Sequence, residues 1–451
     1  MNREKVNLQI HTDKGIVEGV QMDGYAVFRG IPFAKPPVGE LRWKAPQDMD
    51  VWEGVYKADT FARICPQRPA REPNPYYKEF YANPEYQREM NEDCLYLNIW
   101  APEEAKGEKL PVAIYIHGGG FGGGYSSEME FDGEGFARRN VIFVSIAYRL
   151  GIFGFLAHPW LTAENERHIS GNYGILDQIA ALNWVYRNIE AFGGDRDNIT
   201  VFGQSAGCMS TQVLISSGLT DGKIAKAIFQ SGLSCEDELL AVPTLREEEE
   251  YGQKIVEVTG AKNLDELRKM DAETLMSAKD IFDQECWRKA EDGAGVLRIV
   301  PNVDGYVLKE NVRDAYRRGN FKKIPYMEGV VTEDLGTKEE DRKKRVPGML
   351  LQECERWAEK QQETGGKPSY VYWFDRTLPG DNLPAWHSLE LWYVMGTLDR
   401  AWRPWEKHDY ELAEEVQNCW ANFMRTGDPC GSNTGEWRPY TKEDPFVRKF
   451  E

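Results

Sequence analysis

The chain has 451 residues, of which 41% are hydrophobic and 28% charged, proportions that are ordinary for a globular protein. Its formal net charge of -18 argues against nucleic acid as a partner, because the phosphates of a nucleic acid need a basic surface. No stretch approaches roughly 18 uninterrupted apolar residues, so we expect no helix that spans a membrane.

The N-terminal stretch and the cysteines bear on the cellular compartment. The chain begins MNREKVNLQIHTDKG, which lacks the apolar core of a signal peptide. The 8 cysteines are too sparse for a disulfide scaffold, and no CxxC pair suggests a zinc site. We therefore expect a cytoplasmic protein without a bound metal.

Strands and helices are predicted to alternate once the N-terminal part has passed. The first 100 residues are rich in prolines and aromatics, as in FRGIPFAKPPVGELRW, and predict an antiparallel edge with surface loops. Short apolar runs, typical of strands buried on both faces, follow at 111–117, 141–148, 198–202, 225–230 and 324–331. Residues 177–189 show helical spacing. This alternation predicts an α/β protein with a largely parallel sheet covered on both sides.

The segment 235–290 differs from the rest because it is acidic and helical in character. It contains REEEEY at 246–251. We interpret this charge run as the solvated face of a helix.

Residues 203–207 read GQSAG and match the pattern G-x-S-x-G. The motif comes directly after the strand predicted at 198–202 and precedes a helical stretch, which is the strand, sharp turn and helix of a nucleophile elbow. Ser205 would project its hydroxyl from a strained turn, with glycines where a side chain would collide. The N–H group of Ala206 would point to where an oxyanion forms. The alternative is an ordinary serine in a glycine-flanked turn.

A polyglycine stretch, HGGGFGGG, occupies residues 117–124 after another predicted strand. It contains a literal G-x-G-x-x-G, the dinucleotide fingerprint, but no helix opens at these glycines. The strand predicted at 141–148 also lacks the terminal acid that would hold a ribose. A glycine loop instead lets two backbone N–H groups join that of Ala206 in binding an oxyanion. His117 lies upstream of the glycines, and we interpret it as structural.

A serine nucleophile needs an imidazole that accepts its proton. The chain has 6 histidines, and after a nucleophile elbow the acid and then the histidine follow along the chain. That order leaves His387 and His408. His408 lies in RPWEKHDYE, a polar stretch that indicates an exposed side chain, whereas His387 precedes an aromatic-rich segment. We predict that His387 is the base.

These motifs occur within longer stretches that resemble the type-B carboxylesterases, the cholinesterase-like branch of the α/β-hydrolase fold. The resemblance runs nearly end to end and includes FRGIPFAKPPVGELRWKAP, EDCLYLNIW, YRLGIFGFL and GNYGILDQIAALNWVYRNIEAFGGDRDNITVFGQSAG. It implies one α/β-hydrolase domain over residues 1–451, with a central, mostly parallel sheet flanked by helices. An N-terminal antiparallel edge and helical insertions over an active-site gorge are also implied. The expected activity is cofactor-free hydrolysis of a small-molecule ester by a monomer or small homo-oligomer.

The resemblance also assigns roles to positions of this chain that match the family's motifs. The matched nucleophile, base and oxyanion donors are Ser205, His387, Gly119, Gly120 and Ala206. Gln204 departs from the glutamate that most members carry before the serine. It keeps the size of that side chain and drops its charge.

The third member of the triad is expected in MEGVVTEDLG, residues 327–336. The family signature here is roughly G-x-N-x-D-E-G after a strand, and its second acid completes the triad. Alignment puts Glu333 on the first acid and Asp334 on the second, although Val331 replaces the usual asparagine. The resemblance thus implies a Ser-His-Asp triad with Asp334 as the acid, in a family that mostly uses glutamate. Glu333 remains the alternative.

Cys65 and Cys94 match positions that form a disulfide in secreted relatives. Because no signal peptide is evident, we expect both to be reduced thiols. Titration of free thiols in denatured, unreduced protein distinguishes the two states.

Other activities fit the same residues. The same triad can act on feruloyl-type aromatic esters, amides or carbamates, because the loops that shape the pocket set the substrate. A non-catalytic binding protein of the same family is a further alternative, although such members typically lack the serine.

Overall fold

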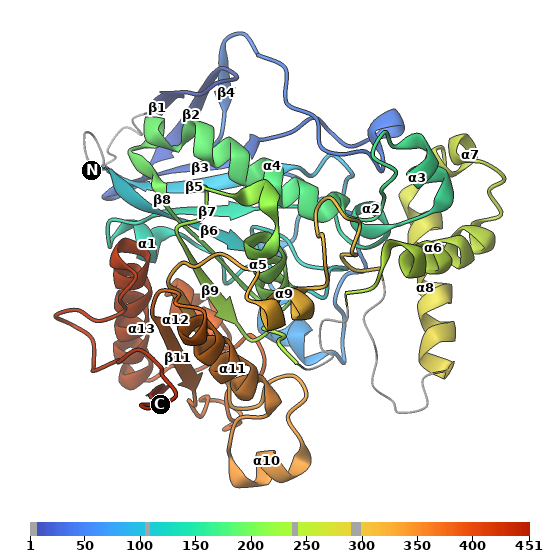
Figure 1. The fold of residues 1–451 in the computed structure, drawn as a ribbon. Coiled ribbons are helices and arrows are strands. Elements are labelled where there is room, and N and C mark those ends of the chain that lie inside the picture. Colours follow the sequence, from blue (N-terminus) through green and yellow to red (C-terminus); the bar gives the residue numbers. More distant parts are fainter. Residues whose placement is uncertain (1–6, 104–108, 237–241, 290–298) are drawn as a thin grey trace.

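The computed structural model describes residues 7–103, 109–236, 242–289 and 299–451. These residues form a 12-stranded sheet in the order β1-β2-β3-β5-β7-β6-β8-β9-β10-β11-β12, with β4 paired to β2 (Figure 1). The strands are β1 (Asn7–His11), β2 (Ile16–Gln21), β3 (Tyr25–Pro32), β4 (Val55–Lys57), β5 (Tyr96–Pro102), β6 (Leu110–Ile116), β7 (Ile142–Ile146), β8 (Gly194–Gln204), β9 (Lys226–Gln230), β10 (Tyr326–Val331), β11 (Ser369–Phe374) and β12 (Val447–Phe450).

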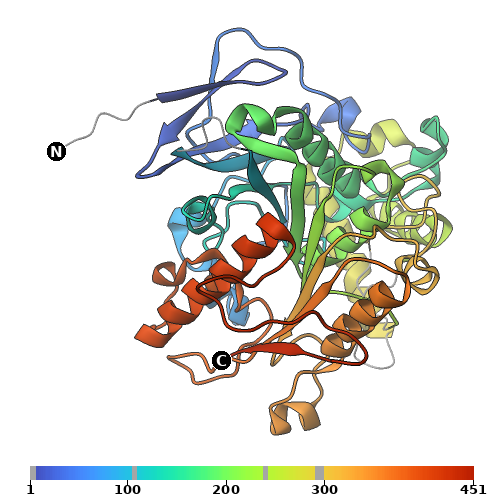
Figure 2. The same cartoon turned by 60° about the vertical axis from the view of Figure 1, so that its left-hand side comes forward.

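The direction of pairing changes along the sheet. Neighbours from β1 through β2, β3 and β5 to β7 are antiparallel, and neighbours from β7 onward to β12 are parallel. Figure 2 shows the blue N-terminal strands at the upper end of the sheet and the red C-terminal strand at the lower end. The antiparallel edge and the five buried strands that the sequence predicts are therefore confirmed, although β8 is longer than its predicted 198–202.

Helices cover both faces of the sheet, as the buried strands require. They are α1 (Glu134–Ala137), α2 (Gly151–Phe155), α3 (Pro159–Glu164), α4 (Tyr173–Asn188), α5 (Ala206–Ser216), α6 (Leu245–Thr259), α7 (Leu264–Arg268), α8 (Ala272–Lys289), α9 (Val312–Arg318), α10 (Glu339–Lys344), α11 (Met349–Glu363), α12 (Leu391–Met395) and α13 (Lys407–Thr426). The helix predicted at 177–189 is α4. No helix within the described ranges is long and apolar enough to cross a membrane.

Strand β6 illustrates how the two faces are filled. Successive side chains of a strand point to opposite faces, so Val112 and Ile114 join the core beneath α4, α5 and α11. Ala113 and Tyr115 join the separate core beneath α1, α12 and α13. A strand buried on both faces must be apolar throughout, which explains the continuous apolar run in the sequence.

The acidic segment forms helices α6 to α8, which lie beside α2 and α3 at the right of Figure 1. Glu247 and Glu250 are exposed, as the solvated-face interpretation predicts. That interpretation is wrong for Glu248, which is 1% exposed. Positions four and seven residues later, Gly252 and Ile255, are also buried, so Glu248 lies on the inward stripe of the helix. Parts of the predicted segment, 237–241 and 290, lie outside the described residues.

Candidate active site

Ser205 occupies the turn between β8, which ends at Gln204, and α5, which begins at Ala206. Its backbone has φ 57° and ψ -125°, a conformation that costs energy for any residue with a side chain. The N–H group of Ser205 donates to the carbonyl oxygen of Gln230 in β9 at 2.9 Å. The neighbouring strand thereby holds the strained turn in place.

The glycines on either side of Ser205 allow the turn to approach β6. A Cβ atom at Gly207 would lie 2.0 Å from the carbonyl oxygen of Ile116. A Cβ atom at Gly203 would lie 2.5 Å from the carbonyl carbon of Gly207. Real Cβ atoms do not come this close to backbone atoms, so the collision predicted from the sequence is confirmed.

The glycine loop after β6 packs against the same turn. Gly119 and Gly120 have φ values of 102° and 61°, in the left-handed region that favours glycine. A Cβ atom at Gly119 would lie 2.2 Å from the carbonyl oxygen of Gly123, and one at Gly118 would lie 2.7 Å from that of Gln204. The loop therefore brings bare backbone next to Ser205.

His117 supports this loop from beneath. Its Nδ1 lies 3.0 Å from the carbonyl oxygen of Gly118, and its ring stacks on Tyr148 with the centroids 4.5 Å apart. The Tyr148 hydroxyl donates to the carbonyl oxygen of His117 at 3.0 Å. Burial lowers the pKa of His117 to about 4, so the ring is neutral at pH 7. These contacts support the structural role expected from the sequence.

The structure brings Asp334 and His387 together. Nδ1 of His387 lies 2.6 Å from Oδ1 of Asp334, and both side chains are buried. The Asp334 carboxylate also accepts the N–H groups of Val331 at 3.1 Å and Leu335 at 2.8 Å. The carbonyl oxygen of Glu333 accepts the N–H group of His387 at 3.2 Å. The turn after β10 thus fixes both the carboxylate and the imidazole.

His408, the other candidate base, lies elsewhere. It is exposed in the first turn of α13. Its Nε2 lies 2.8 Å from the carbonyl oxygen of Glu451. The exposure that the polar sequence around it indicates is confirmed.

Gln204 contacts the imidazole of His387, which lines the same pocket as Ser205. Its Nε2 lies 3.2 Å from Nε2 and 3.5 Å from Nδ1 of His387. The hydroxyl of Ser388 donates to Oε1 of Gln204 at 3.0 Å, which orients the amide. The side chain that replaces the family's usual glutamate therefore contacts His387 without a charge. Ser388 was missed by the sequence reasoning, and its only signal is that it follows His387.

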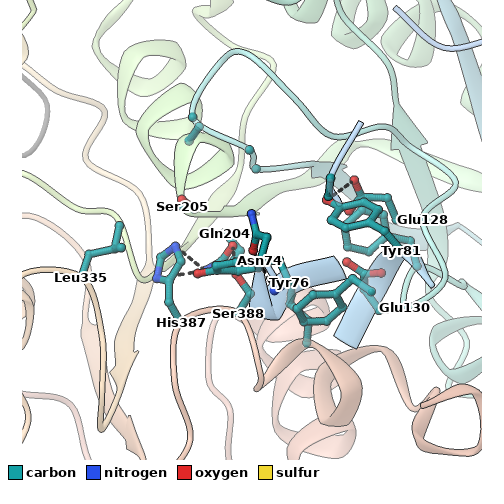
Figure 3. A pocket seen from close by; sticks show the side chains of 18 of the residues that line it. Asn74, Tyr76, Tyr81, Glu128, Glu130, Gln204, Ser205, Leu335, His387 and Ser388 are labelled. Carbon is teal, nitrogen blue, oxygen red and sulfur yellow. Dashed lines mark hydrogen bonds between the residues drawn. The ribbon is translucent and has the colours of Figure 1, made fainter. Parts of the chain in front are cut away.

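A pocket of about 440 Å³ opens over these groups. Ser205, His387 and the glycine loop line one part of it, and Gln204 and Ser388 extend that part. Tyr81, Glu128 and Glu130 lie across from His387 (Figure 3). The acids of this second part were also missed, although they stand close after the glycine loop in the sequence. Within the described residues no group of three or more possible metal ligands occurs.

Cys65 and Cys94 are buried neighbours, and both are free thiols in the structure. A hydrogen bond with Cys65, together with burial, raises the pKa of the Cys94 thiol well above its usual value. The N–H group of Leu150 donates to Sγ of Cys65 at 3.2 Å. Their reduced state in the isolated protein stays a prediction.

Comparisons with known proteins all point to one family. Residues 6–348 and 348–451 match the model of the Carboxylesterase family. The para-nitrobenzyl esterase of Bacillus subtilis strain 168 is 34% identical over 96% of this chain and 93% of that protein. The fumonisin B1 esterase of Sphingopyxis macrogoltabida is 39% identical over 71% of this chain, but the chain spans only 55% of that relative.

Solved structures agree with this match. A PNB esterase superposes with a TM-score of 0.85 and 30% identity, and the match covers 98% of this chain and 95% of the esterase chain. A carboxylesterase of Geobacillus stearothermophilus superposes with a TM-score of 0.79 and 31% identity, and the match covers 98% of this chain and 96% of that carboxylesterase. The predicted α/β-hydrolase fold and esterase class are confirmed, and the chain belongs to the carboxylesterase family of serine hydrolases.

Proposed function

We propose that this carboxylesterase works through a Ser-His-Asp triad and three backbone donors for the oxyanion. The triad is Ser205, His387 and Asp334, and the donors are the N–H groups of Gly119, Gly120 and Ala206. The observation that carries the proposal is the 2.6 Å contact between His387 Nδ1 and Asp334 Oδ1, beside the pocket that Ser205 lines from its strained turn.

The first step forms an acyl-enzyme. Because Nδ1 of His387 donates to Asp334, Nε2 is an acceptor. It lies 3.2 Å from Nε2 of Gln204 in the structure and takes the proton of the Ser205 hydroxyl in the reaction. Oγ of Ser205 then attacks the ester carbonyl carbon, and the developing oxyanion receives hydrogen bonds from the glycine loop and Ala206. When the carbonyl re-forms, the ester C–O bond breaks, and the alcohol leaves with the proton that His387 returns.

The second step regenerates the enzyme. A water molecule gives one proton to Nε2 of His387 and attacks the acyl carbon. The bond to Oγ of Ser205 breaks, and the proton returns to that oxygen as the carboxylic acid leaves. Asp334 stays ionised throughout and stabilises the imidazolium that forms in each step.

The side chain of Asp334 is one carbon–carbon bond shorter than the glutamate usual in the family. The N–H groups of Val331 and Leu335 that donate to its carboxylate support its use as the triad acid. They hold the shorter side chain within hydrogen-bond distance of His387.

We further propose that the substrate is a small-molecule ester, because a pocket of about 440 Å³ suits a ligand of that size. The net charge of -18 supports a chain that works without nucleic acid. The described strands share one sheet, which supports a single domain over residues 1–451. That it acts as a monomer or small homo-oligomer stays an expectation. Reduced Cys65 and Cys94 would suit a cytoplasmic location, which thiol titration tests.

Replacement of the nucleophile tests the proposal. We expect Ser205→Ala to lower kcat for p-nitrophenyl acetate by roughly 10⁴-fold or more with an unchanged melting temperature. Ser216→Ala is the matched control, since Ser216 ends the helix that Ser205 precedes and its hydroxyl donates to the Gln212 carbonyl oxygen of that helix. Turnover retained in Ser205→Ala would overturn the assignment.

A further inference from the structure

Two acidic side chains line the pocket and take no part in the proposed triad. Glu128 and Glu130 belong to the loop between β6 and α1, and they lie across the pocket from His387 (Figure 3). They are 5% and 2% exposed. Carboxyl groups buried this deeply need a compensating partner.

The two carboxyl groups differ in the partners they have. Oε1 of Glu128 accepts the Tyr81 hydroxyl at 2.8 Å and the Tyr125 N–H group at 3.1 Å. The carboxyl group of Glu130 contacts that of Glu128, but its Oε2 receives no N–H or O–H donor from the residues that the structure describes. The hydroxyl of Tyr115, a residue that also lines the pocket and is 1% exposed, likewise has no hydrogen-bond partner there. Two buried polar atoms on one wall are thus left for a ligand.

The charged side chains on this part of the pocket lining are acidic, while Arg400 lies outside the lining and donates to the carbonyl oxygen of Met129. No lysine or arginine occurs among the described residues that line the pocket. Burial raises the pKa of Glu128 to about 7, and burial together with the charge of Glu128 raises the pKa of Glu130 well above its usual value. A cation in the pocket would favour the ionised forms and offset the cost of burying them.

We propose that Glu130, with the hydroxyl of Tyr115 and the carboxyl of Glu128, forms a subsite for a primary ammonium group carried by the ester substrate. The inference rests on the proposed esterase mechanism and names its substrate class: an ester whose acyl or alcohol part bears a protonated amine. The carboxylate and phenol oxygens can accept N–H groups, and an ammonium group has three to donate.

The geometry favours a primary ammonium over other cations. A trimethylammonium group has no N–H donor and would leave both unpartnered oxygens unsatisfied. A divalent metal such as Ca²⁺ takes six to eight oxygen ligands, and no group of three possible metal ligands occurs in the described part of the chain. The rings of Tyr81 and Phe131 line the same wall and add attraction for a cation.

Inhibition by three hexyl compounds tests the subsite with the whole chain. Hexylammonium carries both charge and N–H donors, hexyltrimethylammonium carries charge alone, and hexyl methyl ether carries neither. Each is added to the hydrolysis of p-nitrophenyl acetate at pH 7.5, and its competitive inhibition constant is measured. We expect hexylammonium to have a constant about tenfold or more below those of the other two, as a charge-assisted hydrogen bond would give.

Substitutions test whether Glu130 and Tyr115 cause the preference for hexylammonium. We expect Glu130→Gln to shrink the preference of hexylammonium over the ether to under about threefold, and Tyr115→Phe to reduce it in part. Glu134→Gln should keep the full preference, because Glu134 lies on α1, contacts Tyr25 and Arg138, and does not line the pocket. Each constant is compared within one protein, so partial loss of folded enzyme does not imitate the effect.

The possible outcomes distinguish a failure of the ammonium subsite from a failure of the proposed esterase mechanism. Hydrolysis without preference for hexylammonium overturns the subsite and leaves the esterase mechanism standing. Equal preference in Glu130→Gln and the unmodified protein also overturns it, as does tighter binding of hexyltrimethylammonium. Absence of any hydrolysis by the unmodified chain would instead contradict the proposed function.

Discussion

The pocket has two polar sides, and they differ in how their acidic groups are held. Behind His387, the Asp334 carboxylate accepts two backbone N–H groups and contacts the imidazole. On the opposite side, Oε2 of Glu130 and the Tyr115 hydroxyl have no partner among the described residues. The first side is preorganised before any substrate binds, which suits chemistry. The second still needs donors, which suits recognition of a substrate.

The largest expected effect comes from removing His387, the proposed catalytic base. We expect His387→Ala to lower kcat for p-nitrophenyl acetate by roughly 10⁴-fold, because His387 is the proposed acceptor of the Ser205 proton. His408→Ala is the control and should retain full activity, since that side chain is exposed and its Nε2 contacts the chain end. Comparable losses in both variants would contradict the assignment.

The second-largest expected effect distinguishes Asp334 from Glu333, the two adjacent acids after β10. Asp334→Asn keeps the shape of the side chain but cannot stabilise an imidazolium, so we expect kcat/KM to fall roughly 10²- to 10⁴-fold. Glu333→Gln should change it by less than about threefold, because the backbone of Glu333, not its side chain, contacts His387. The reverse ranking would show that the alignment of this turn is one residue off.

A third effect concerns the oxyanion loop. Gly119→Ala places a Cβ atom 2.2 Å from the Gly123 carbonyl oxygen at a φ of 102°, so the loop must shift. We expect a loss of roughly 10²-fold in kcat, as for removal of one oxyanion donor. In Gly122→Ala the nearest atom is 4.0 Å away, and activity should persist. Full activity in Gly119→Ala would mean that this loop does not bind the oxyanion.

The smallest expected effect is on the stability of the fold, and it concerns the buried carboxyl group of Glu130. Burial raises the pKa of Glu130, so the folded chain binds its proton more tightly than the unfolded chain. The free energy of unfolding should therefore fall as pH rises from about 4.5 through the folded pKa. Between pH 5 and 8 we expect this fall to be smaller in Glu130→Gln, because that side chain cannot ionise.

Urea unfolding at the two pH values measures this difference. Glu134→Gln removes a charge four residues away and outside the pocket, and should follow the unmodified chain. An equal pH dependence in Glu130→Gln would show that a partner already stabilises the Glu130 carboxylate.

The contrast between the two sides also explains what the sequence can predict. The catalytic side depends on backbone shapes that only certain residues allow, such as the bare turn at Gly207 and the left-handed loop at Gly119. Those requirements appear as short motifs, and the spacing of Ser205, Asp334 and His387 follows from strand order.

The side of the pocket that carries Glu130 and Tyr115 depends on packing that has no local signature. Tyr115 lies in an apolar run and is indistinguishable there from an ordinary core residue. Its hydroxyl and Oε2 of Glu130 have no hydrogen-bond donor or acceptor partner in the described part of the chain, which no local pattern in the sequence indicates. Likewise, Glu248 belongs to a charge run but faces inward because of the helix stripe it occupies. Such features become visible only when the neighbours are known.

Labelling with a fluorophosphonate shows whether Ser205 is the activated nucleophile, because the reagent reacts with a serine that a nearby base has activated. After digestion, mass spectrometry identifies the modified residue. We expect a single adduct on Ser205, lost in Ser205→Ala and strongly slowed in His387→Ala. An adduct on another serine, or hydrolysis that continues after complete labelling, would contradict it.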